Sequence, residues 1–176
     1  GEGVCMSEPI KVENELITGD WICASLSHQG ILAICASFDY DDGKHSPDYT
    51  IQFTNLNTNK QVEISVERKS IIGFYDSMLL LLTDIRPLRE ASVEEVFNDP
   101  RIETFREIKG TSSALSETDV SLLHERRVLY YSCFNDLFSF NVDTRENTKI
   151  DIGRKVLSIA SFTGIDCTVK AVFKSY

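Results

Sequence analysis

Apolar and polar residues alternate in paired segments along this chain. Apolar side chains occupy every second position of 49–53 and again of 62–66, with polar residues between them. A period of two predicts β-strands with one buried and one solvent-exposed face. The intervening stretch Asn57-Thr58-Asn59-Lys60 is typical of a tight turn, so the pair predicts an antiparallel hairpin.

The hairpin occurs twice. Residues 55–60 recur as 141–146 at an offset of 86 (141 minus 55), and 138–142 alternate with the same period. Upstream, 25–28 recur as 121–124 at an offset of 96 (121 minus 25), which pairs His28 with His124 as equivalent positions. The difference of 10 is an extra loop at 39–48 in the first copy. A repeat of this kind predicts an architecture.

Further strand pairs precede and follow the two copies. We expect strands at 21–26 and 31–38, turned at 28–30, and a matching inner strand at 128–133. Each copy then forms four antiparallel strands in sequence, a small meander. Between the copies, 71–75 and 78–83 predict another pair, and the apolar run 78–82 fits a buried strand.

Residues 92–109 allow two interpretations. The first is a helical insertion: Ser92 and Glu95 have the spacing of a capping box, Asp99-Pro100 resembles a second helix start, and Gly110 stands where a helix C-terminal glycine would. The second interpretation is two short strands, 93–97 and 102–108, that close a middle sheet. The sequence favours the helix only slightly.

Composition narrows the class of protein. The chain of 176 residues is 42% apolar and 26% charged with a net charge of −9, which indicates an acidic globular protein. A negative field opposes nucleic acid and anionic membrane, and no apolar run is long enough to span a bilayer. Five scattered cysteines without C-x-x-C spacing favour neither a zinc site nor a disulfide framework, so we expect a cytoplasmic or nuclear protein.

Parts of the chain resemble WD40-type β-propeller blades. Residues 25–33 (Ser-Leu-Ser-His-Gln-Gly-Ile-Leu-Ala) resemble the strand, turn and strand that open a blade, and 48–53 (Asp-Tyr-Thr-Ile-Gln-Phe) resemble the passage into its third strand. Residues 135–140 also resemble a kelch-type blade. No Trp-Asp closes the third strand, because Phe53-Thr54 and Phe140-Asn141 stand there, so the hydrogen-bond network of a standard blade is not carried over.

The resemblance implies an all-β, antiparallel, β-propeller-like fold. Half of the repeat offset is 43, within the roughly 40–45 residues of a WD40 blade. The expected division is an N-terminal extension at 1–20 and a propeller-like domain at 21–176. Its blades are near 21–67, 70–109 and 111–153, with a partial fourth from 156. Since typical propellers have about 4–8 blades, we expect part of a propeller, or a fold that a partner chain completes.

Two groups of residues are candidates for partner binding. The loop 39–48 carries four carboxylates without EF-hand spacing, which predicts a solvated acidic insertion that contacts a partner. If 92–109 is a protruding helix, its apolar stripe docks onto another protein. These candidate residues are Asp39, Asp41, Asp42, Asp48, Val96, Ile102, Phe105 and Ile108.

The sequence predicts a non-enzymatic protein–protein interaction module or scaffold subunit of an intracellular complex. It contains neither a G-x-S-x-G motif nor a glycine-rich phosphate loop, and its histidines are scattered, so we assign no catalytic residue, metal or cofactor. One alternative is a hydrolase or ligand-binding propeller that uses the acidic loop with a divalent cation. Another is a closed β-sandwich that binds peptide along an edge strand.

Overall fold

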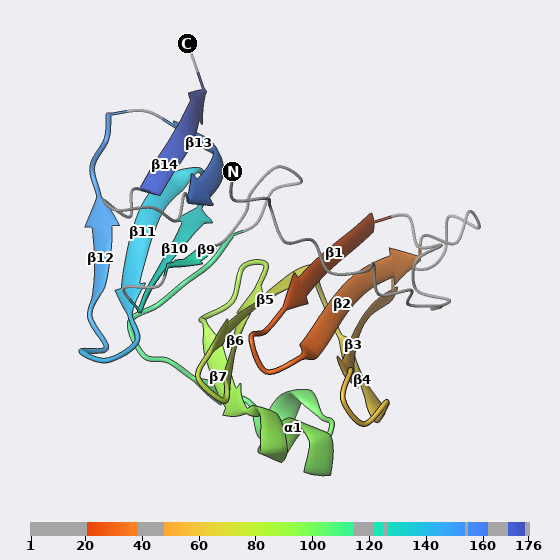
Figure 1. Cartoon of the computed structure of the whole chain (residues 1–176). Helices are drawn as coiled ribbons and strands as arrows, with labels where there is room; N and C mark the ends of the chain where they lie inside the picture. Colours follow the sequence, from red (N-terminus) through yellow and green to blue (C-terminus); the bar gives the residue numbers. More distant parts are fainter. Residues whose placement is uncertain are drawn as a thin grey trace, which may run out of the picture.

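The computed structural model describes residues 21–38, 48–114, 122–124, 127–153, 155–161 and 169–174. Three four-stranded antiparallel sheets follow one another, each with its strands in chain order, and a two-stranded hairpin comes after them (Figure 1). The prediction that the chain is mostly β with antiparallel sheets is confirmed. The extension at 1–20 lies outside the described residues, so the domain division stays a prediction.

The strands of each sheet follow in chain order. The first sheet contains β1 (Trp21–Leu26), β2 (Ile31–Phe38), β3 (Asp48–Asn55) and β4 (Gln61–Val66). The second contains β5 (Ser70–Tyr75), β6 (Met78–Thr83), β7 (Arg89–Ser92) and β8 (Arg106–Glu107). The third contains β9 (Leu122–His124), β10 (Val128–Cys133), β11 (Asp136–Asn141) and β12 (Asn147–Ile150). The hairpin is β13 (Lys155–Ser161) with β14 (Val169–Lys174).

Successive sheets meet through their first strands. β1 contacts β5, β5 contacts β9, and β9 contacts β13. The chain therefore leaves each sheet from its fourth strand and returns to the first strand of the next (Figure 1). The connections between second and third strands (β2–β3, β6–β7 and β10–β11) consequently share one end of the array, which we call the upper end. Helix α1 (Val93–Asn98) lies at the opposite end.

The two copies of the predicted hairpin have the same turn. The side-chain oxygen of Asn55 accepts hydrogen bonds from the backbone N–H groups two and three residues ahead, at 2.9 and 3.3 Å, and that of Asn141 does the same, at 2.9 Å each. Asn59 and Arg145 have positive φ at the fifth position, at 58° and 66°. This Asx-type turn fixes where each fourth strand begins, so the offset of 86 is confirmed.

The upstream offset was wrong by one residue. Ile31 pairs with Asn55 and Val128 pairs with Asn141, so the two copies differ there by 97 (128 minus 31). His124 pairs with Val128 and therefore corresponds to Ser27, whose N–H donates to Ile31. His28 is instead an exposed turn residue. The hydrogen-bond ladder and the turn determine strand register, whereas a short run of similar residues does not.

The segment 92–109 begins as the helical interpretation predicts. Of the two alternative strands, 93–97 was wrong because it is helical, and only Arg106–Glu107 within 102–108 is a strand. Ser92 Oγ accepts from the Glu95 N–H at 3.0 Å and the Glu95 carboxylate accepts from the Ser92 N–H at 2.8 Å, so the capping box opens α1 as predicted. Asp99 ends α1 and does not begin a second helix, because its N–H donates to the Glu95 carbonyl and its carboxylate binds Arg101. A single 3₁₀ turn, η2 (Ile102–Thr104), follows before β8.

The second sheet lies between two hydrophobic cores. Leu79 and Leu81 of β6 pack in the core shared with the first sheet, whereas Leu80 and Leu82 pack in the core shared with the third, and all four are fully buried. A strand buried on both faces needs apolar residues at every position. The unbroken leucine run therefore reflects a central position, and the predicted buried strand at 78–82 is confirmed.

Candidate functional site

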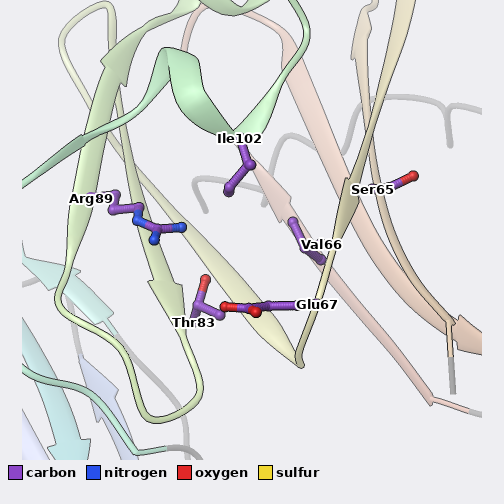
Figure 2. Close-up of a pocket in the computed structure, with 6 residues that line it drawn as sticks. All are labelled: Ser65, Val66, Glu67, Thr83, Arg89 and Ile102. Atoms are coloured by element: carbon purple, nitrogen blue, oxygen red, sulfur yellow. The ribbon is translucent and has the colours of Figure 1, made fainter. Parts of the chain in front are cut away.

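A pocket of about 300 Å³ lies at the boundary between the first and second sheets. It is bounded by the end of β4 on one side and by β6 and β7 on the other, and η2 covers it. In Figure 2 the side chains of Glu67, Thr83 and Arg89 converge from opposite walls, and that of Ser65 points away. The lining residues are Ser65, Val66, Glu67, Thr83, Arg89 and Ile102.

Strand ends place the polar lining. Glu67 directly follows β4, Thr83 is the last residue of β6, and Arg89 is the first of β7. The link between β6 and β7 is held from outside the pocket: Arg86 and Ser113 exchange backbone hydrogen bonds at 3.3 and 2.9 Å. The Thr83 hydroxyl shares a hydrogen bond of 3.0 Å with a buried serine of β5, so it is fixed in place.

Positive charge concentrates around one carboxylate. Arg86 Nε donates to Glu67 Oε1 at 2.7 Å. This hydrogen bond, helped by the positive charges of Arg86, Arg68 and Arg89, holds the pKa of Glu67 below its usual value. The positive charges of three arginines therefore act on Glu67, and of these Arg89 lines the pocket itself.

Arg89 is the arginine that lines the pocket. Its side chain is 19% exposed, and within the described part of the chain its ion-pair partner is Glu107, with an N–O distance of 3.6 Å. That distance is longer than a good charge-assisted hydrogen bond. The guanidinium thus extends into the pocket with most of its donor capacity unused by described residues.

Two exposed apolar residues mark the upper end. Ile85 in the β6–β7 link is 50% exposed with φ 54°, and Phe134 in the β10–β11 turn is 66% exposed with φ 51°. The two turns are equivalent connections of neighbouring sheets. Arg86 joins Ile85 to the pocket, because its Nη1 donates to the Ile85 carbonyl at 2.9 Å while its Nε binds Glu67.

The acidic loop joins β2 to β3, and the strand ends that it connects lie at the same end. Asp39, Asp41 and Asp42 lie outside the described residues, and Asp48 begins β3, with only its backbone described. The loop connects β2 to β3, which makes it the counterpart in the first sheet of the turns that carry Ile85 and Phe134. Its partner-binding role stays a prediction.

The predicted docking stripe is a core element. Val96 is fully buried and Phe105 is 5% exposed, both in the core between the first and second sheets, and Ile102 packs against them. Ile108 is buried in the other core. The expectation that these four residues protrude together was wrong. α1 is only six residues long, and the chain after it folds back over β4 to fill the gap between two sheets.

Sequence reasoning did not identify the pocket. Glu67, Thr83 and Arg89 belong to three segments that only sheet packing brings together. The available signal was Ile85, an apolar residue in a short polar link. Within the ranges the structure describes, no group of three metal-ligating side chains occurs, and no helix is both long and apolar enough to cross a bilayer.

A scan against protein-family models and a search of curated proteins both return no match to this chain.

Proposed function

We propose that this chain is a propeller-like protein-interaction module, acting without catalysis as a scaffold subunit of an intracellular complex. Its partner is another polypeptide, bound at the upper end. The proposal requires neither nucleic acid nor a membrane. The main observation in support of this proposal is that two exposed apolar residues, Ile85 and Phe134, adopt a left-handed backbone conformation.

The conformation of these residues is costly for the isolated chain. A positive φ costs a residue with a Cβ about 1–2 kcal/mol, and glycine, asparagine or aspartate would occupy such turns with less strain. A β-branched residue such as Ile85 is especially unfavourable there. Strained positions of this kind concentrate at functional sites. An exposed isoleucine and phenylalanine gain little from folding, so a binding partner is the physical reason for their presence.

The arrangement of the sheets supports the propeller-like part of the proposal. Three meander sheets contact one another in succession through their first strands. A propeller brings first strands together around its axis in this way. β13 and β14 form a two-stranded sheet, which is marginal without further strands. This supports a fold that a partner polypeptide extends.

Substitution of the two exposed residues tests the function. We expect Ile85→Asn and Phe134→Asn to retain or raise the melting temperature, because asparagine tolerates positive φ, and to weaken binding to a partner purified with the wild-type chain. The matched control is Leu26→Asn, which changes a 60% exposed residue at the opposite end of the array. Calorimetry with purified components measures the affinities. Equal affinity for all four proteins would exclude the upper end as the binding face.

A further inference from the structure

The chemistry of the pocket favours an anionic group over a neutral one. A guanidinium offers five N–H donors and no acceptor, and a carboxylate can accept two of them side by side. Arg89 extends into the pocket with its described acidic partner at 3.6 Å. A partly buried donor without a good acceptor is unfavourable, so a carboxylate entering the pocket supplies what Arg89 lacks.

The same charges disfavour a cation. Glu67 is already engaged by Arg86 at 2.7 Å, so a cationic ligand would have to displace that arginine. Arg68 and Arg89 add two further positive charges close to the same carboxylate. The chain as a whole has a net charge of −9. Beyond a Debye length of about 8 Å that charge is largely screened at physiological salt, so the local arginines dominate at contact.

Size and shape indicate a side chain as the occupant. A volume of about 300 Å³ is at the small end for ligand pockets. Val66 and Ile102 provide an apolar wall for the methylene groups of an acidic side chain. Arg86 donates both to the Ile85 carbonyl and to Glu67 of the pocket wall, and the exposed Ile85 side chain is available to an apolar residue next to the acidic one.

We propose that the pocket formed by Glu67, Thr83, Arg89 and Ile102 receives an aspartate or glutamate side chain of the partner polypeptide, with Arg89 as the anchoring residue. An apolar neighbour of that acidic residue packs on Ile85. This inference rests on the proposed function, because it specifies the chemistry of the partner at the upper end.

A pair of dipeptide probes tests the pocket directly. N-acetyl-glutamyl-leucine amide and its isosteric glutamine counterpart are titrated into the ¹⁵N-labelled full chain, and the side-chain N–H signals of the arginines are followed. We expect saturable shifts at Arg89 and at the Thr83 amide with the glutamate probe, with affinity about tenfold or more above that of the glutamine probe. Raising the salt concentration from about 20 to about 300 mM should lower the affinity of the glutamate probe and leave that of the glutamine probe unchanged.

Two arginine variants distinguish specific binding by Arg89 from a general effect of positive charge. Arg89→Gln should abolish the saturable shift, whereas Arg101→Gln removes an exposed arginine paired with Asp99 outside the pocket and should leave it unchanged. Should Arg89→Gln fail to fold, Ile102→Phe gives the second measurement, because it fills the pocket while leaving every charge in place. Equal affinity of the two probes, a linear response without saturation, or tighter saturation by inorganic phosphate would overturn the inference.

The partner measurement distinguishes the two proposals. If Ile85→Asn and Phe134→Asn weaken partner binding while Arg89→Gln binds as the wild type does, the pocket inference fails and the proposed function stands. If none of the three variants changes partner affinity, the proposed function itself fails.

Discussion

Buried thiols illustrate how single residues take their chemistry from the fold. Cys23 of β1 and Cys35 of β2 are directly opposite each other in the strand register. Burial is the main cause of the raised pKa of both thiols, and for Cys35 it raises the pKa to about 12. The thiolate is the reactive form of cysteine, so both residues act as small apolar side chains in the native state.

Alkylation tests this assignment. We expect Cys35 to remain unmodified by iodoacetamide at about pH 8 in the native chain and to react fully in denaturant, because its native thiolate population is negligible. Peptide mapping by mass spectrometry measures the modification at this site. Rapid native labelling of Cys35 would contradict the burial that raises its pKa.

The capping box gives a second prediction at this scale. Ser92→Ala removes the acceptor of the Glu95 N–H and should lower the free energy of unfolding by about 1 kcal/mol. Ser112→Ala, at an exposed position outside the helix, is the matched control and should change it by less than about 0.5 kcal/mol. Urea denaturation followed by circular dichroism measures both. Equal effects would show that the cap is energetically neutral.

At the scale of elements, β6 is the strand on which two cores depend. Leu81→Ala should destabilise the chain by about 2–5 kcal/mol, because it opens a cavity in the core between the first and second sheets. Leu26→Ala, at an exposed strand end, should have an effect within about 0.5 kcal/mol. Comparable denaturant midpoints for the two variants would place β6 outside the core.

Local patterns predicted most strands because they reflect local physics. Two local patterns predicted β3, β4 and their connection: the alternation in 49–53 and 62–66, and the turn beginning at Asn55. Neither an Asx turn nor a period of two depends on residues far away in the sequence. The short capping motif at Ser92 also succeeded. Asp99 failed as a helix start because the same residue type ends α1 by binding Arg101, and the sequence does not indicate which neighbour a carboxylate chooses.

At the scale of the whole molecule, ionic contacts join the sheets at the end where α1 lies. Arg127 binds Asp76 of the second sheet at 2.9 Å and Asp143 of the third at 2.8 Å. Arg145 binds Glu90 of β7, which also accepts from the Tyr75 hydroxyl at 3.0 Å. Exposed pairs of this kind contribute little individually, so the apolar cores carry most of the stability.

Alkaline pH should destabilise the assembled fold. Burial raises the pKa of Tyr131 to about 12 and that of Cys35 to about 12, above their values in the unfolded chain. The unfolded state therefore loses these protons first, and stability that is intact below about pH 9 should fall as pH rises toward about 12. Urea midpoints measured between about pH 8 and pH 11 test the trend. In Tyr131→Phe the urea midpoint should fall less steeply with pH at the alkaline end of this range. A slope equal to that of the wild type would exclude this tyrosine as a cause.

The sequence by itself determined most of the strands, the repeated turn and the helix cap, because each depends on residues within a few positions of one another. Only the tertiary structure decided the register offset of 97, the burial of Val96 and Phe105, and the convergence of Glu67, Thr83 and Arg89. Those features depend on which faces of which sheets pack together. Residues far apart in sequence meet there, and no local pattern encodes the distance between them.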